Sequence, residues 1–541
     1  MSLGQHLLPR APAVPLIAAA ALAVALMSTG PAGASARDLY VDVAHPAAAD
    51  RNEGSQPGQP LETISAGVAR AFPGDTVRVA PGTYRESIRF PRSGAGPERR
   101  IHVVAAGGGE VVVKGSDVVT GWTAAGGGIW KKTGWKVNSQ QVFGDGRPLQ
   151  QTGVTSPFHT RAWDGRPILP PVGRGLADMT PASFFHDARS ATLYVRLPDD
   201  GDPNAHRMEA SDRDDVLSSG TSSFIELRGL EFSHSNGSAG GSMRGMVNVE
   251  GSSWTVTGCA FTHGDFVGLS ISGQGHRIQD NVANHNGDLG IAINGSDAAH
   301  GWAPYSGRPA QDIVLEGNET SYNNYRGFYR YYQSGGVKAS NSCNGVRVLR
   351  HTARSNDGPG LWFDLGCRNI TIARSILQGN SRGIEYEISD QAVISHNLVT
   401  GSSEQGIYVS ASSHVSVANN TLDHNLWGIV VHGAPRPEHP QLKENALRNN
   451  VIRETGKADL VMYVGEKATG NTSDYNRFYR RGGGVEISWT RTARYPITHR
   501  SLRKFAEQTG QDSHSSTEGA EALAAPISDQ TSAQAAKGGP R

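Results

Sequence analysis

The residues best suited to chemistry are three acidic side chains and a lysine, placed in short segments that resemble one another. They are Lys338, Asp364, Glu385 and Glu387. The segments read GVKAS, GLWFD and GIEYE, and their first glycines recur every 23 or 24 residues. Carboxylates brought close together repel, so at least one should have a raised pKa unless a cation lies among them. Such a group suits acid–base cleavage of a sugar bond, or binding of Ca²⁺.

These segments belong to a longer repeat of roughly 22 to 24 residues between about residues 224 and 475. Repeats that align on their last residue end at Asn286, Asn323, Asn356, Asn380, Ser402 and Asn425. A unit this short, rich in Gly, Asn and β-branched residues, cannot bury a face alone and must stack on its neighbours. The repeat therefore predicts an all-β solenoid with parallel strands.

Alternation along each strand indicates which side chains face outward. We expect residues 337–340, 361–364, 384–387 and 407–410 to be strands of one parallel sheet, with Trp362 beside Glu385. One outward column then holds Lys338, Trp362, Glu385 and Tyr408, and the other holds Ser340, Asp364, Glu387, Ser410 and His432. The alternative is that these columns are solvated charged side chains with no function.

Aromatic and basic residues near these columns are candidate sugar contacts. Trp362 is expected to be an exposed stacking platform beside the acids. Two insertions border the same rungs, at about residues 295–311 and 324–335, and loops beside a rigid scaffold commonly form pockets. The candidate binding residues are Trp362, Tyr408, Arg326, Arg330, Tyr331, Trp302, His300 and Arg382.

The register also separates the three cysteines. Cys343 and Cys367 fall at equivalent points of adjacent rungs, about 4.8 Å apart, which a disulfide tolerates; two stacked free thiols are the alternative. Another column lies five residues before each repeat end: Cys259, Asn281, Asn318, His351, Ser375, Asn397 and Asn420. Its amides can bridge rungs at a tight bend, so His351 is expected to be structural rather than catalytic.

Composition and the chain ends set the class of protein. A formal net charge of +1 over 541 residues argues against nucleic-acid binding. Residues 1–36 resemble a secretory signal, with Arg10 before an apolar run and Ala34-Ser35-Ala36 as the cleavage site. We expect a secreted or periplasmic protein that acts as a monomer, with no membrane span once the signal is removed.

Changes in composition and residue pattern along the chain predict five further parts. Residues 37–115 should cap the solenoid and start its first rungs, 116–215 form a β-rich insertion, and 216–480 form the solenoid with the active face. Residues 481–515 should close the far end with a short helix, and 516–541 should be a disordered tail.

The central block resembles secreted bacterial right-handed parallel β-helix proteins of the pectate-lyase-like superfamily. The matching pattern comprises Gly335, Gly336, Lys338, Gly358 to Trp362, Asp364, Gly383, Ile384 and Glu387 to Ser389. The resemblance implies a right-handed coil and carbohydrate chemistry, either hydrolysis by paired acids or β-elimination of uronates with Ca²⁺.

Three functions follow, and a polysaccharide or oligosaccharide is the partner in each. The first is a glycoside hydrolase in which Asp364 and Glu387 are the acid/base pair, Glu385 assists and Lys338 neutralises. The second is a Ca²⁺-dependent lyase in which Asp364, Glu385 and Glu387 hold the metal and Lys338 or Arg382 is the base. The third is a non-catalytic glycan-binding or adhesion protein.

Overall fold

A computed structural model describes residues 35–154, 156, 161–162, 164–237, 243–296, 308–433, 442–463, 468–490 and 497–517 of the 541-residue chain. Most of the expected signal segment, His300, Trp302 and most of the expected tail lie outside these ranges. No helix within them is long and apolar enough to cross a membrane.

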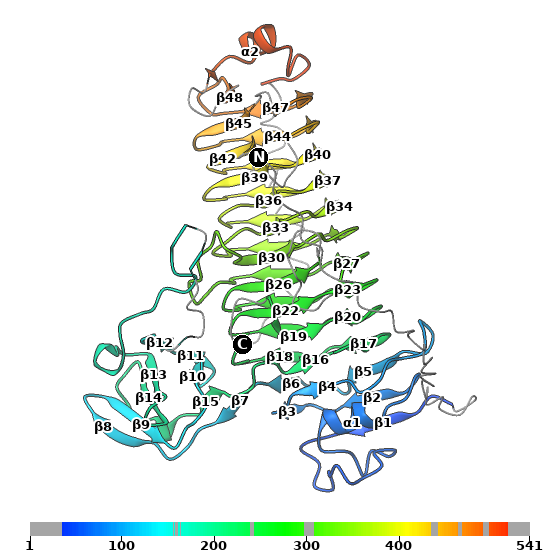
Figure 1. Cartoon of the computed structure of the whole chain (residues 1–541), viewed down its shortest axis with the longest axis vertical. Coiled ribbons are helices and arrows are strands. Elements are labelled where there is room, and N and C mark those ends of the chain that lie inside the picture. Colours follow the sequence, from blue (N-terminus) through cyan, green and yellow to red (C-terminus); the bar gives the residue numbers. More distant parts are fainter. Residues whose placement is uncertain are drawn as a thin grey trace, which may run out of the picture. The chain divides into compact units, whose positions relative to one another are not determined.

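The described chain winds through three long sheets, so that each turn adds one short strand to each sheet (Figure 1). Sheet 1 contains β1 (Asp38–Val41), β2 (Thr76–Val79), β5 (Ile101–Ala105), β17 (Ile225–Arg228), β20 (Thr255–Thr257), β24 (Arg277–Gln279), β28 (Val314–Glu316), β31 (Arg347–Leu349), β34 (Arg368–Ala373), β37 (Asp390–Ser395), β40 (Ser413–Ala418), β43 (Ala446–Arg448) and β46 (Thr472–Asp474). Sheet 2 contains β3 (Gly82–Tyr84), β6 (Val111–Lys114), β18 (Glu231–Ser233), β21 (Ala260–Thr262), β25 (Val282–Asn284), β29 (Glu319–Ser321), β32 (Thr352–Arg354), β35 (Ile376–Gln378), β38 (Leu398–Thr400), β41 (Thr421–Asp423), β44 (Val451–Arg453) and β47 (Arg477–Tyr479).

Sheet 3 carries the residues singled out above. It contains β4 (Ile88–Arg89), β16 (Leu217–Ser218), β19 (Gly245–Val249), β22 (Val267–Ile271), β26 (Leu289–Asn294), β30 (Gly335–Ser340), β33 (Leu361–Phe363), β36 (Ile384–Glu387), β39 (Gln405–Ser410), β42 (Trp427–His432), β45 (Ala458–Tyr463), β48 (Ile487–Thr490) and β49 (Thr498–His499). All neighbours in this sheet pair in parallel except β48 and β49. A small extra pair, β23 (Gly273–Gln274) and β27 (Ala310–Gln311), lies beside sheet 1.

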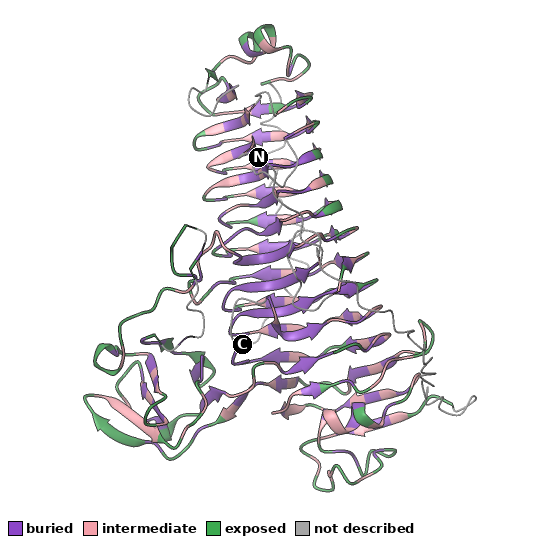
Figure 2. Cartoon of the chain, viewed as in Figure 1, coloured by how far each residue is buried: buried purple, intermediate pink, exposed green. Residues whose placement is uncertain are grey.

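Inward-facing side chains of the rungs form one continuous core, and Figure 2 shows buried residues, in purple, along the stacked strands. On β33 and β36 the inward residues Leu361, Phe363, Ile384 and Tyr386 are fully buried. Burying an apolar side chain of this size contributes about 1.5–3 kcal/mol, and each new rung covers the core of the previous one.

Amide ladders run along the bends between the sheets, as the repeat predicted. Asn281 donates from Nδ2 to Asn318 Oδ1 at 2.9 Å and to the carbonyl of Val256 at 2.9 Å. The same Asn318 oxygen accepts from the Asn281 amide at 3.0 Å. His351 lies buried in this column, with Nε2 2.8 Å from Thr320 Oγ1, as expected of a structural residue.

Glycine is required at the start of a sheet 3 strand where the backbone of the next rung comes very close. A Cβ on Gly383 would lie 2.2 Å from Val399 Cγ1 and 2.5 Å from the carbonyl of Gly406. This close approach requires a residue without a Cβ immediately before β36.

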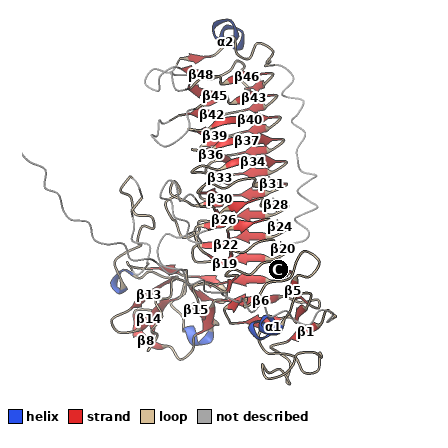
Figure 3. Cartoon of the chain, turned by 45° about the vertical axis from the view of Figure 1, so that its right-hand side comes forward, coloured by secondary structure: helices blue, strands red, loops and turns tan. Residues whose placement is uncertain are grey.

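The two α-helices lie at the two ends of the solenoid, and two short 3₁₀ helices lie between residues 176 and 205; the remainder of the described chain is strand and turn (Figure 3). Helix α1 (Ile64–Arg70) is capped by Thr63, whose hydroxyl accepts from the Ala66 amide. Helix α2 (Leu502–Thr509) buries Phe505 against Trp489 and stops at Gly510, which is left-handed.

An insertion interrupts the coil between two successive rungs. It contains β7 (Ser116–Val118), β8 (Thr123–Gly126), β9 (Ile129–Thr133), β10 (Val142–Gly144), β11 (Arg147–Pro148), β12 (Gln150–Gln151), η1 (Leu176–Asp178), β13 (Ser183–Asp187), β14 (Thr192–Arg196), η2 (Pro203–Ala205) and β15 (Met208–Ser211). These strands form two small sheets of their own. Strands β5 and β6 precede the insertion and pair with β17 and β18, which follow it, so the coil resumes without losing register.

The expected disulfide is not formed. Cys343 and Cys367 stand on adjacent rungs as predicted, but both are buried free thiols, as is Cys259. Each thiol instead donates to a backbone carbonyl three residues earlier. Cys343 Sγ lies 3.1 Å from the Ser340 carbonyl oxygen, and Cys367 Sγ lies 3.3 Å from the Asp364 carbonyl oxygen. Burial and the neighbouring sulfur raise the pKa of Cys343, so the thiol form is favoured.

Candidate active site

The predicted outward column of sheet 3 is confirmed. Lys338 pairs with Trp362, Trp362 with Glu385, and Glu385 with Tyr408 on successive strands. In the neighbouring column Glu387 pairs with Ser410, and Asp364 directly follows β33, whose last residue pairs with the residue before Glu387. Asp364 and Glu387 are therefore on adjacent rungs, about 4.8 Å apart along the coil.

Lys338 is a buried cation at one side of the carboxylates. It is only 4% exposed, and its Nζ lies 3.1 Å from Asp364 Oδ2 and donates to the carbonyl of Tyr332 at 3.0 Å. The same ammonium lies 3.2 Å from the centre of the Trp362 ring. A buried charge needs such partners because water cannot solvate it.

Glu385 is a buried acid held by an arginine. Its Oε1 accepts from Arg382, which also donates to Glu404 at 3.1 Å and to Gln405 at 2.9 Å. Burial raises the pKa of Glu385 to about 7, and the negative charge of Asp364 adds to that rise, while Arg382 opposes it. The sequence-based expectation of one raised carboxyl pKa agrees with this arrangement.

Three polar atoms on the two central rungs are buried without a hydrogen-bond partner in the described structure: Trp362 Nε1, Asp364 Oδ1 and Glu385 Oε2. Folded proteins rarely leave such atoms unsatisfied, and a cluster of them is typical of a place where a ligand or water completes the bonding. Glu387, by contrast, is only partly buried.

Trp362 is not the exposed platform that the sequence suggested. It is 3% exposed, because it lies in the ladder between Lys338 and Glu385 and the Lys338 ammonium covers one ring face. A sugar cannot stack on that face.

Two tyrosines and Arg382 border the carboxylates as expected. The Arg382 guanidinium lies 4.8 Å from the Tyr408 ring and 5.3 Å from the Tyr331 ring. The Tyr331 hydroxyl donates to Glu404, which ties the 324–335 insertion to the strand that follows the cluster. Arg330, in contrast, makes a partly exposed ion pair with Asp357 at 3.0 Å.

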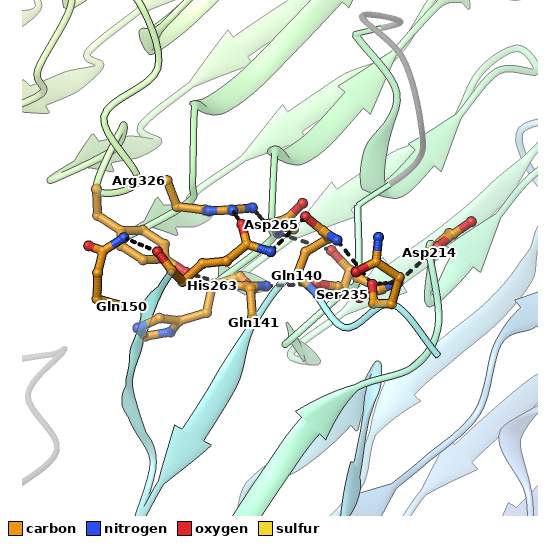
Figure 4. Close-up of polar contacts among 12 residues, drawn as sticks. Gln140, Gln141, Gln150, Asp214, Ser235, His263, Asp265 and Arg326 are labelled. Atoms are coloured by element: carbon orange, nitrogen blue, oxygen red, sulfur yellow. Dashed lines mark hydrogen bonds and ion pairs between the residues drawn. The ribbon is translucent and has the colours of Figure 1, made fainter. Parts of the chain in front are cut away.

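Arg326 serves a different place from the one predicted. Its side chain is 7% exposed, pairs with Asp265 and donates to Gln151 of the insertion. Figure 4 shows this network, in which Gln141 also reaches back to the carbonyls of Ser235 and His263. Burial lowers the pKa of Arg326 to about 9. Arg326 therefore anchors the insertion to the coil.

Sequence reasoning missed one further acid, Asp288, because it precedes its strand instead of alternating within it. Asp288 is fully buried, accepts from Gln333 Nε2 at 3.3 Å, and has one oxygen without a partner. Burial raises its pKa from 3.8 to about 7, although the Ser334 and Gln333 hydrogen bonds and the Lys338 charge oppose the rise.

Asp288 should make stability fall with rising pH. Between about pH 4 and pH 7 the unfolded chain has released this proton and the folded chain keeps it, so stability falls by up to roughly 1.4 kcal/mol per pH unit. We expect Asp288→Asn to raise the melting temperature relative to wild type increasingly from pH 4 to 7, with no further gain above. Calorimetry across this range measures the difference. A flat difference for Asp288→Asn across this range would contradict the prediction.

The three acids do not form a metal site in this arrangement. Among the described residues, no group of three or more His, Cys, Asp or Glu side chains is placed to hold a metal ion. Asp364 is paired with Lys338 and Glu385 with Arg382, so each of these two carboxylates already has a cationic partner. The donor set therefore does not fit Ca²⁺.

Comparison with known proteins agrees on the fold. A model of the right-handed β-helix region matches residues 245–422. The solved structure of XylC in complex with xylose is 15% identical, with 84% of this chain and 86% of that chain covered and a TM-score of 0.63. A structure described as a glycoside hydrolase is 12% identical, with coverage of 84% and 96% and a TM-score of 0.53. No curated protein matches significantly in sequence.

These likenesses define the class of protein. The chain is a right-handed parallel β-helix protein, as the resemblance of its central block implied. Sequence identities this low establish the fold alone.

Proposed function

We propose that the protein is an exported glycoside hydrolase that retains anomeric configuration, with Asp364 as nucleophile and Glu387 as general acid/base. The observation that carries the proposal is the set of unpartnered atoms on the two central rungs, beside two carboxylates on adjacent rungs. Retaining glycosidases hold their two carboxyl groups about 5–5.5 Å apart, close to one rung spacing of about 4.8 Å.

The different surroundings of Asp364 and Glu387 suit them to different roles in the reaction. Asp364, ion-paired with Lys338, attacks the anomeric carbon while Glu387 protonates the departing oxygen. Glu387, now a carboxylate, then takes a proton from water, which displaces Asp364 and releases the sugar. The partial exposure of Glu387 suits a group that must meet the leaving group and water.

The surrounding residues position this pair. Arg382 bridges Glu385 and Glu404, and the Glu404 contact with Tyr331 holds the 324–335 insertion over the cluster. Because the unpartnered oxygens are buried, substrate entry requires surrounding side chains to move, and we propose that Tyr331, bound to Glu404, is one of them. Breaking one hydrogen bond to a charged group costs about 1.5–3 kcal/mol, which sugar binding can offset.

A lyase has less support. Its candidate bases are engaged, since Lys338 contacts Asp364, Tyr332 and Trp362, and Arg382 contacts two carboxylates. The xylose held by XylC and the description of the second structure as a glycoside hydrolase also favour hydrolysis.

The stereochemistry of the product tests the proposal. Incubation with a panel of aryl α- and β-glycosides of neutral and acidic sugars should release sugar whose first-formed anomer matches the substrate, because two displacements restore the configuration. Proton NMR in the first minutes distinguishes the anomers before they equilibrate. An inverted first product would exclude Asp364 as nucleophile, and an unsaturated product absorbing in the ultraviolet would establish a lyase instead.

A further inference from the structure

The two outward columns of sheet 3 are covered unequally on the two sides of the carboxylates. Toward the N-terminal rungs every member from β22 to β30 is buried: Ser270, Ala292 and Lys338 in one column, and Ser272, Asn294 and Ser340 in the other. Toward the C-terminal rungs Ser410 and Val430 are buried, whereas Tyr408, His432, Val461 and Tyr463 are partly exposed. Partly exposed side chains in these columns are therefore found only on the C-terminal side of the carboxylates.

An apolar cluster closes the N-terminal side. We call it the apolar wall: Ala162, Ile168 and Leu169 from the insertion, Phe328, Tyr329 and Tyr332 from the 324–335 loop, and Met243, Phe266, Val267, Leu289 and Ala292 beneath them. Polar contacts hold its two loops together. The Tyr329 amide donates to the Ile168 carbonyl at 2.7 Å, and the Tyr329 hydroxyl donates to Asp164 at 2.7 Å.

Lys338 connects the apolar wall to the proposed nucleophile. Ala292, a wall residue, pairs directly with Lys338, and the Tyr332 carbonyl accepts from Lys338 Nζ at 3.0 Å. Lys338 in turn contacts Asp364 at 3.1 Å. Two rung spacings, about 9–10 Å along the coil, therefore separate Asp364 from Ala292, and Lys338 occupies the rung between them, which limits this side to about one sugar ring.

We infer that the enzyme acts only at chain ends, accepting one terminal sugar against the apolar wall and directing the rest of the glycan toward Tyr408 and His432. This inference rests on the proposed function and specifies its substrate as a glycan terminus. The apolar wall excludes cleavage of internal bonds, because only a groove that is open on both sides of the carboxylates would admit them.

Product size tests the inference. For a sugar whose aryl monoglycoside the protein cleaves, the probes are oligosaccharides of that sugar labelled at the reducing end, together with the matching polymer. We expect monosaccharide as the only new small product at early times, and labelled chains that shorten by one unit. Early products of mixed length from wild-type protein would overturn end-only action and leave hydrolysis standing. Failure to cleave any aryl glycoside or oligosaccharide would refute both.

Substitution of the wall tests its role. Phe328→Ala should open the wall and yield labelled products shortened by two or more units, raising their share at least several-fold over wild type. Leu169→Ala, which removes less apolar contact, serves if Phe328→Ala does not fold. Val172→Ala is the matched control, since Val172 is exposed and lies outside the wall. An unchanged product distribution in a folded wall variant would overturn the assignment of the wall.

Discussion

Replacement of Asp364 by Asn is expected to lower kcat by at least about 10³-fold, because the amide cannot form the glycosyl intermediate. The amide oxygen can still accept from Lys338, so the fold should persist, although a buried cation loses its counter-charge and the variant should melt earlier. Steady-state rates on an activated aryl glycoside, with circular dichroism to show folding, measure both effects.

The control for Asp364→Asn is the same change at Asp390, which lies on β37 of sheet 1 and pairs with His414. It should keep near wild-type activity. If folded Asp364→Asn protein retained more than about a tenth of the activity, Asp364 would not be the nucleophile.

Glu387→Gln is expected to lower kcat about 10²- to 10⁴-fold on substrates with poor leaving groups, and less on aryl glycosides that leave without protonation. The glutamine variant also lacks the base that activates water. Azide needs no deprotonation, so added azide should restore turnover and yield a glycosyl azide with the configuration of the substrate. Chromatography and NMR of the product measure this rescue.

Azide should not restore Asp364→Asn with the same stereochemistry, because that variant forms no covalent intermediate. Equal sensitivity of Glu387→Gln to good and poor leaving groups, with no rescue, would contradict the acid/base role. Glu385, which is buried and held by Arg382, would then be the next acid to test.

The relation of the carboxylates to one another could be predicted from the sequence alone. Rungs of nearly constant length place Lys338, Trp362, Glu385 and Tyr408 above one another, and strand alternation turns them out of the core. The same periodicity predicted the amide ladder through Asn281 and Asn318. It also predicted that Cys343 and Cys367 stand on adjacent rungs, because the pattern is local and repeated. The disulfide was wrongly predicted, because rung spacing permits a bond without requiring one.

What covers the carboxylates was decided by tertiary structure. The insertion carries no repeat, and its contact with the 324–335 loop joins Asp164 and Tyr329, which are 165 residues apart in the chain. No periodic pattern reports such a contact. The pairing of Arg326 with Asp265 and with Gln151 of the insertion, and the hydrogen bond from Gln333 of the 324–335 loop to Asp288, are contacts of the same kind. A repeat determines which residues are neighbours along the coil, whereas burial, charge pairing and the side from which a substrate can enter depend on segments that the repeat does not contain.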